Sequence, residues 1–291
     1  MRPFLIILMT FQLTLASGQD SAEKLSDKAF SYYIYDKDID SALYYYKSLQ
    51  QTFPSFRPSY INSVIGSCYL KKGDKELAKN YLLQSLKRPD STDIFPERSC
   101  IYIGDIFLEA KDYISALAYY DSSTTHYRTK VARMSRHRFK EGNIQTIYKK
   151  AICFDKLNKL DTAIKIMTPY IFLNFDDYVI DSSEAEDIVD FYIALIKKRY
   201  SVKEIRQEFK IAMKELKYKR ENDSSRLHLN PEWKSILIDC YFNFFGKRVD
   251  IFRLGGVGVK DFNEETPVGW RKEDLLKEFR KTLAYKKIKK V

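Results

Sequence analysis

The feature that most constrains the fold is a helix–turn–helix pattern between Ile65 and Asp90. Apolar and small residues three or four positions apart lie on one face of a helix, and here two such runs are separated by a glycine–acid break. The pattern predicts two short helices joined by a tight turn and ended by a proline. Its landmarks are, in order, Gly66, Tyr69, Gly73, Asp74, Ala78, Leu82 and Pro89.

The same pattern occurs four times along the chain. The alanine of each second helix stands at Ala42, Ala78, Ala116 and Ala163. Twelve residues earlier, each first helix has a small residue, except in the first unit. These positions are Phe30, Gly66, Gly104 and Ala151, each followed after three residues by an aromatic one: Tyr33, Tyr69, Phe107 and Phe154. A recurring unit of about 34 residues predicts stacked hairpins, because one hairpin cannot bury its own apolar face.

These residues resemble the tetratricopeptide repeat family, over residues 22–170 closely and over 183–220 weakly. The resemblance implies an all-α fold class, an α-solenoid of helix-turn-helix repeats with irregular C-terminal helices and a short extended segment. The N-terminal segment of the chain is similar to those of exported bacterial proteins of the Bacteroidetes type. Proteins of this family bind other proteins, so the resemblance implies a partner protein or peptide.

We expect four segments along the chain. They are a signal peptide (1–18), about four repeats (19–175), further helical pairs that form a degenerate repeat (176–246), and an extended segment with a capping helix (247–291). Periodicity predicts helices over 183–200 and 201–220, and a further one from Pro231 to about Phe245. Around Gly255 and Gly256, residues 248–262 are expected to form a short hairpin or an extended strap, before a helix over 272–287.

The N-terminus predicts export. Arg2 precedes an apolar run over 4–15, and Ala16 and Gly18 suit a cleavage site before Gln19. The alternative is a first core helix. Later in the chain no apolar run reaches the ~18 residues of a membrane span, so the mature protein is expected in the periplasm, on the cell surface or secreted, without a transmembrane segment.

The family resemblance also implies which residues line a partner-binding groove on the first helix of each repeat. In the second repeat they are Tyr60, Ser63, Ser67 and Lys71; in the third Arg98, Ile101, Asp105 and Glu109; in the fourth Gln145, Tyr148, Ile152 and Lys156. Family members that clamp a carboxylate carry Lys and Asn at two of these positions in the first unit. Asp27 and Ser31 stand there instead, so that clamp is not expected.

A basic insertion separates the third and fourth repeats. The formal net charge is +11, and residues 128–140 contain six cations and no acid: Arg128, Lys130, Arg133, Arg136, Arg138 and Lys140. One interpretation is a solvated start to a helix, and the other is a patch that recognises an acidic partner. Export argues against nucleic acid as that partner.

The sequence predicts no enzyme, no cofactor and no metal site. His126, His137 and His228 do not have the spacing of a metal-binding helix, and no nucleophile motif occurs. Asp36, Asp38 and Asp40 resemble the start of a calcium loop, which would need Gly and Glu where Ser41 and Lys47 stand. The four cysteines are expected to be buried and unpaired, with disulfides as the alternative: Cys68, Cys100, Cys153 and Cys240.

The function predicted from these features is non-catalytic: a protein-interaction scaffold or adaptor in the cell envelope that uses the repeat groove. Two alternatives remain open. One is an immunity-type inhibitor of a toxin, and the other is a factor that binds anionic envelope glycans through the basic insertion.

Overall fold

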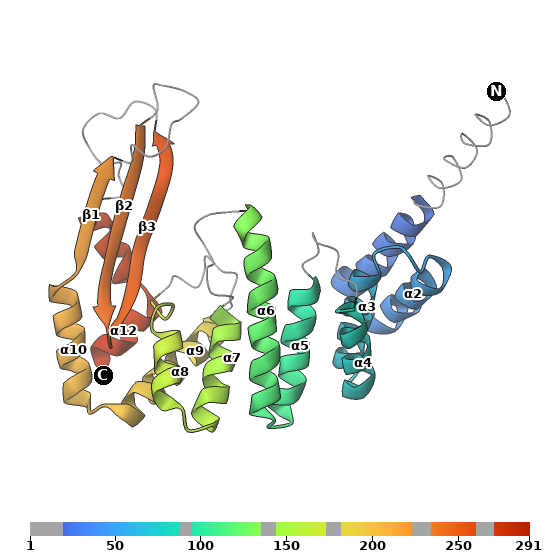
Figure 1. Cartoon of the computed structure of the whole chain (residues 1–291), viewed down its shortest axis with the longest axis horizontal. Coiled ribbons are helices and arrows are strands. Elements are labelled where there is room, and N and C mark those ends of the chain that lie inside the picture. The colour runs from blue at the N-terminus through green and yellow to red at the C-terminus, as the bar shows by residue number, and fades with distance from the viewer. Residues whose placement is uncertain (1–19, 88–94, 135–143, 173–181, 223–233, 260–270) are drawn as a thin grey trace. The chain divides into compact units, whose positions relative to one another are not determined.

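The computed structural model describes residues 20–87, 95–134, 144–172, 182–222, 234–259 and 271–291. The chain forms two compact units, Met1–Arg133 and Met134–Val291. Helices pair with their neighbours along the chain in each unit, and a three-stranded sheet follows the helices of the second (Figure 1). This arrangement confirms the predicted α-solenoid of helix-turn-helix repeats.

Unit 1 consists, in its described part, of consecutive helical hairpins. The first combines a helix over 20–31, extended by the π-helical turn η1 (Tyr32–Asp36), with α2 (Ile39–Thr52). The next two are α3 (Pro58–Lys71) with α4 (Lys75–Ser85), and α5 (Phe95–Glu109) with α6 (Tyr113–Met134). Because α3 packs against α2, α4 and α5, the hairpins share one continuous core.

Small residues let the two helices of a hairpin come close together. A Cβ atom on Gly66 would lie 2.7 Å from Leu82 Cγ, and one on Gly104 would lie 2.5 Å from Tyr120 Cε1. Real Cβ atoms do not approach other carbon atoms so closely. The glycines on α3 and α5 are therefore required by packing, as the repeat pattern predicts.

Each turn inside a hairpin of unit 1 has the same backbone design. One residue adopts a left-handed conformation, and the aspartate after it accepts a hydrogen bond from a backbone N–H of the second helix. The left-handed residues are Lys37, Gly73 and Lys111, with φ of 55°, 83° and 62°. The capping aspartates are Asp38, Asp74 and Asp112.

The first hairpin contains one residue more than its neighbours. Ala29 is fully buried, whereas Phe30 is 42% exposed, so the assignment of Phe30 to the small packing position is wrong. Tyr32 stacks on Tyr45 at a centroid distance of 5.4 Å, as Tyr69 stacks on Tyr81 at 5.5 Å. The small packing position is therefore Ala29 rather than Phe30, and the aromatic position is Tyr32 rather than Tyr33. The π-helical turn accommodates the extra residue.

Unit 2 begins with two further hairpins. They are α7 (Ile144–Lys156) with α8 (Leu160–Met167), and α9 (Ser182–Arg199) with α10 (Val202–Lys214). Ala151, Ala163 and Met167 are fully buried, as the fourth repeat predicts. Ser201 and Glu204 form a capping box at the start of α10.

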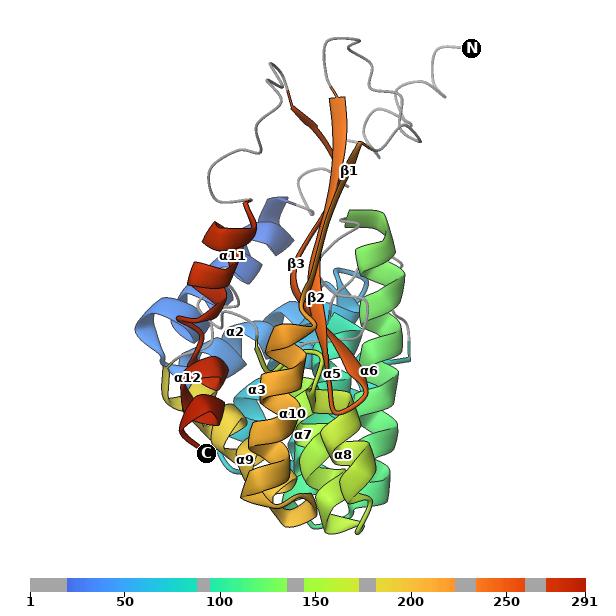
Figure 2. The same cartoon turned by 90° about the vertical axis from the view of Figure 1, so that its left-hand side faces the viewer.

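An antiparallel sheet follows α10. It consists of β1 (Lys217–Asn222), β2 (Lys234–Phe244) and β3 (Lys247–Val259) in the order β1-β2-β3. Phe245 and Gly246, with φ of 46° and 67°, form the two-residue turn between β2 and β3, where two positive φ angles match the sheet twist. Figure 2 shows the sheet nearly edge-on, with α11 (Lys272–Phe279) to one side; α12 (Leu283–Lys290) completes the unit.

The prediction of a helix from Pro231 to about Phe245 is wrong, because residues 234–244 form strand β2. Ile238, Cys240, Phe242 and Phe244 are buried, and the residues between them are half-buried or exposed. This alternation has the period of two that belongs to a strand with one buried face. Of the two alternatives for residues 248–262, the extended segment is confirmed as far as Val259, where β3 is one continuous strand, and the hairpin around Gly255 and Gly256 is wrong.

The predicted signal peptide, residues 1–18, lies outside the described residues. Among the helices that are described, none has the length and apolar character needed to cross a membrane.

Candidate interaction surface

Three of the four groove residues predicted in the second repeat are buried. The hydroxyl of Tyr60 lies 2.8 Å from that of Tyr46, which belongs to the preceding hairpin. Ser99 of α5 donates a hydrogen bond of 2.9 Å to Ser63. These side chains join neighbouring helices, so they offer little surface to a partner.

The third buried residue, Ser67, belongs to a small polar cluster that includes an exposed residue. Its hydroxyl lies 2.6 Å from the hydroxyl of Tyr33, and the Nζ atom of Lys71 lies 4.0 Å from the centroid of the Tyr33 ring. Burial raises the pKa of Tyr33, while the hydrogen bond with Ser67 and the charge of Arg98 lower it in part. The structure therefore brings Ser67 and Lys71 into contact with Tyr33, which the groove prediction omitted, and the charge of Arg98 acts on the same tyrosine.

In the third repeat the predicted residues differ in exposure. Arg98 is exposed and Ile101 is half-buried. Asp105 accepts a hydrogen bond of 2.7 Å from the Tyr120 hydroxyl, and Glu109 forms an ion pair with Lys75. Arg98 is thus the member of this group whose charge lowers the pKa of Tyr33.

The groove residues predicted in the fourth repeat lie in unit 2. Gln145 donates hydrogen bonds of 2.9 and 2.8 Å to the two carboxylate oxygens of Glu184. Tyr148 packs edge-on against Phe191 at 5.3 Å. Ile152 is half-buried and Lys156 is exposed. The predicted set is therefore divided between two units.

The first hairpin exposes large apolar side chains that the sequence analysis did not assign to a site. Phe30, Ile34, Tyr35 and Tyr44 are 42, 43, 74 and 68% exposed, and together we call them the first-hairpin surface. The rings of Phe30 and Tyr35 meet edge to face at 6.2 Å. This surface could not be predicted from the repeat pattern, because the packing positions of this hairpin are displaced by one residue and Phe30 therefore lies outside the core.

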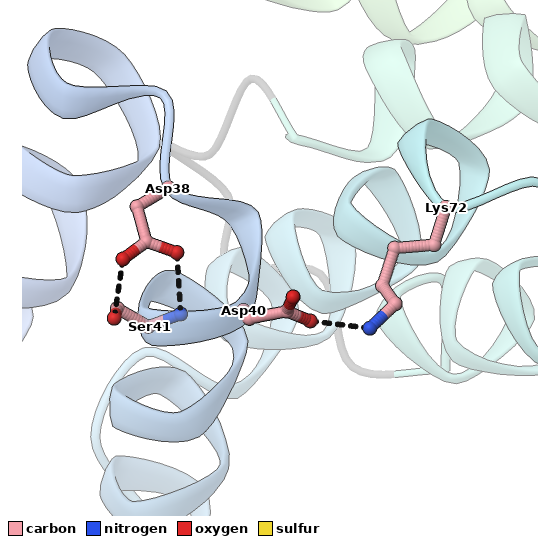
Figure 3. A network of polar contacts seen from close by, with 4 residues as sticks. All are labelled: Asp38, Asp40, Ser41 and Lys72. Atoms are coloured by element: carbon pink, nitrogen blue, oxygen red, sulfur yellow. Dashed lines mark hydrogen bonds and ion pairs between the residues drawn. The ribbon is translucent and has the colours of Figure 1, made fainter.

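The aspartates that resemble a calcium loop have structural roles instead. Asp38 accepts hydrogen bonds from the backbone and the hydroxyl of Ser41, and Asp40 forms an ion pair with Lys72 (Figure 3). The hydrogen bond from the Ser41 hydroxyl is the main cause that lowers the pKa of Asp38. Within the described residues, no group of three or more potential ligands could hold a metal ion.

The cysteines are core residues. All four are buried, and Cys68, Cys100 and Cys240 form no disulfide. Burial raises the pKa of each of these three thiols to about 11, so little thiolate exists near neutral pH. These thiols are therefore poor nucleophiles and behave as small apolar side chains, as predicted.

The basic insertion and the histidines cannot be placed in a site. Helix α6 continues to Met134, but the side chains of residues 126–143 lie outside the described residues, and so does His228. The interpretation of the insertion as an acidic-partner patch stays a prediction.

No family model matches this chain, and no curated protein matches it. The solved structures to which the chain is similar include two of MamA. "Crystal structure of MamA protein" is 14% identical with a TM-score of 0.40, and the match covers 62% of this chain and 92% of that one. "Crystal structure of MamA" is 15% identical with a TM-score of 0.35, over 56% of this chain and 90% of that one. Likeness at this level carries no functional argument.

Proposed function

We propose that this protein is a non-catalytic scaffold that binds another protein through the first hairpin of unit 1, in the cell envelope. One observation carries the proposal: four large apolar side chains, 42 to 74% exposed, lie on a single hairpin. Exposed apolar groups gathered in one place mark interaction sites, and aromatic residues supply much of the binding energy at interfaces.

The cations beside this surface fit a protein interface. Phe30 lies one helical turn before Tyr33, so the two side chains are neighbours on the same side of the helix. Lys71 lies over the Tyr33 ring, and Arg98 acts on the same tyrosine. An apolar centre with a charged rim is the common arrangement of protein interfaces, and the rim favours a partner with acidic residues beside its apolar contact.

The envelope location is supported by the signal-peptide pattern in residues 1–18. It can be tested directly by expressing the full chain in a bacterium and following removal of these residues. Mass spectrometry of the exported protein should give an N-terminus at Gln19. Retention of the full chain in the cytoplasm would contradict this part of the proposal.

The binding surface is tested by affinity capture from the native envelope with three proteins. They are the wild type, the double variant Phe30→Ser and Tyr35→Ser, and the control Ile114→Ser, which changes a side chain 72% exposed on another hairpin. We expect a stoichiometric protein that binds the wild type and the control and is lost from the double variant.

Two results would overturn this assignment. A partner retained by the double variant would place the interface elsewhere, and the absence of any partner would argue against a scaffold. Sedimentation of the purified proteins adds a separate check. If the wild type dimerises and the double variant does not, the first-hairpin surface binds a second copy of this chain rather than another protein.

A further inference from the structure

An open pocket of about 730 Å³ lies at the C-terminal end of unit 2. Its lining combines four cations with one tyrosine and contains no acid: Arg280, Tyr285, Lys286, Lys289 and Lys290. The volume falls in the usual range for small-ligand sites, about 300–1,000 Å³. The pocket belongs to neither the predicted groove nor the basic insertion.

The helix that carries most of these cations is held firmly in place. On α12, Ala284 and Ile288 are 0 and 2% exposed. The Tyr285 ring meets Phe279 at 5.2 Å and Phe209 at 5.4 Å, both edge to face. The C-terminal lysines therefore stand on a packed helix.

The pocket cations differ from their neighbours in having no acidic partner. Lys287 pairs with Asp190 at 2.8 Å, and Lys281 pairs with Glu278 at 2.7 Å. None of the four cations in the pocket forms an ion pair with any residue that the structure describes. Like charges gathered without counter-ions repel one another, so an anion that entered the pocket would relieve that repulsion.

We propose that this pocket binds a ligand with two or more phosphate groups. Four positive charges exceed what a single carboxylate can neutralise. The planar guanidinium of Arg280 suits two phosphate oxygens at once, and the lysine ammonium groups suit the remaining oxygens as point charges. The Tyr285 hydroxyl adds an uncharged donor. Such a ligand is either a free phosphorylated compound or the headgroups of a phospholipid surface.

The two sources are separated by two binding measurements on the full chain. Titration calorimetry with tripolyphosphate tests a free ligand, and flotation with vesicles of phosphatidylglycerol in phosphatidylcholine tests a lipid surface. The pocket variant combines Lys286→Gln, Lys289→Gln and Lys290→Gln. A matched control combines Lys197→Gln, Lys203→Gln and Lys210→Gln, which removes the same charge from exposed sites on α9 and α10.

We expect the pocket variant to bind at least about tenfold more weakly, since each partly exposed charge contributes a modest factor. The control should keep most of the affinity. Arg280→Lys keeps the charge but loses the two-point contact, so it should give a smaller decrease. Binding should weaken as salt rises.

Tripolyphosphate binding that the pocket variant loses would support a free ligand, and binding to vesicles alone would support headgroups. Equal loss in variant and control would overturn the site, since it would mean that only net charge matters. Absence of binding to both probes would overturn it as well. Unchanged far-ultraviolet circular dichroism and unfolding midpoints exclude a folding defect as the cause. The outcome is independent of the first-hairpin surface.

Discussion

Unit 1 and the C-terminal part of unit 2 bury their apolar side chains in different ways. In unit 1 two hairpins repeat one local arrangement, in which a small residue on the first helix lies against a larger one on the second: Gly66 against Leu82 and Gly104 against Tyr120. Around the sheet, the core combines rings from elements far apart in the chain, and Phe172 contacts Phe209, Phe242 and Phe279. Local repetition tolerates a change in one hairpin, whereas a core built from distant elements fails as a whole.

The largest expected effect is in the aromatic core of unit 2. Phe242 is 1% exposed, and its ring contacts Phe172 and Phe279 at 5.3 and 5.4 Å. Phe242→Ala leaves a cavity between elements that no local contact can close, so unit 2 should lose about 3–5 kcal/mol of unfolding free energy. Native-state hydrogen exchange at increasing denaturant concentration should show this loss for the amides of unit 2. The protection of the amides in unit 1 should not change.

Asn243→Ala is the matched control for this prediction. Asn243 is exposed on the opposite face of β2, so its change should stay within about 0.5 kcal/mol. If Phe242→Ala destabilised unit 1 as strongly as unit 2, the contrast between local and distributed cores would be wrong.

The second effect concerns the close approach of α5 and α6. In Gly104→Ala the new Cβ atom would lie 2.5 Å from the buried Tyr120 ring. Such overpacking should lower the free energy of unfolding by about 1–3 kcal/mol. Alanine otherwise favours a helix over glycine by about 1 kcal/mol, so the sign of the result is informative. Thermal unfolding should show a lower midpoint for unit 1.

Gly66→Ala serves as the comparison for Gly104→Ala. Its Cβ atom would meet Leu82 at 2.7 Å, and a leucine side chain can adjust more readily than a tyrosine ring wedged between helices. A smaller loss than for Gly104→Ala is therefore expected. A gain in stability for either variant would show that the helices are farther apart than the structure has them.

The same contrast explains what the sequence could predict. The repeats were accessible because glycine, aromatic and alanine positions recur at fixed spacing, and each spacing reflects a contact within one hairpin. The first hairpin was misaligned by one residue, since a π-helical turn changes the spacing without changing the residue types. Strand β2 was missed because Ile236, Leu237 and Tyr241 also fit a helical face. Its β-branched and aromatic content, with Gly246 as a turn, was the better signal.

The candidate site could be predicted from the sequence less well than the fold, for a physical reason. The family resemblance identifies helix positions, but exposure depends on what the neighbouring hairpin supplies at each position. Ser63 is covered because Ser99 faces it from α5, whereas Lys71 has no such cover. The first-hairpin surface follows from the register of η1, which only the structure reveals.

The third prediction tests whether the turns of unit 1 depend on local backbone conformation alone. Gly73 has φ of 83° and no atom within 4 Å of a Cβ built on it. Gly73→Ala should therefore lose about 1 kcal/mol through backbone strain and nothing through packing. Lys111→Gly, at φ of 62°, should gain less than about 1 kcal/mol, because glycine also stabilises the unfolded chain by entropy. Urea unfolding measures the change in unfolding free energy for each variant. If both variants gained or both lost stability, the turns would not share one backbone design.

The smallest expected effect is the pH dependence of the same turns. The hydrogen bond from the Ser115 side chain is the main cause that lowers the pKa of Asp112 below its ordinary value of 3.8, with the backbone N–H of Ser115 next. A carboxylate whose pKa is lower in the folded state contributes stability that is fully present above the unfolded pKa. That contribution is lost as pH falls through the lower, folded pKa.

Asp112→Asn keeps an oxygen that can cap α6 but cannot titrate. Unfolding midpoints measured from pH 6 down to pH 2 should therefore fall less steeply for the variant than for the wild type, because below about pH 4 the wild type loses the contribution that its ionised carboxylate makes at pH 6. Asp27→Asn is the matched control, because Asp27 is exposed in the middle of the helix over 20–31 and lies outside the turns of unit 1. Parallel pH curves for Asp112→Asn and the wild type would mean that the hydrogen bonds to the ionised carboxylate do not hold the turn. The distinction between a locally built unit 1 and a distributed unit 2 would then weaken.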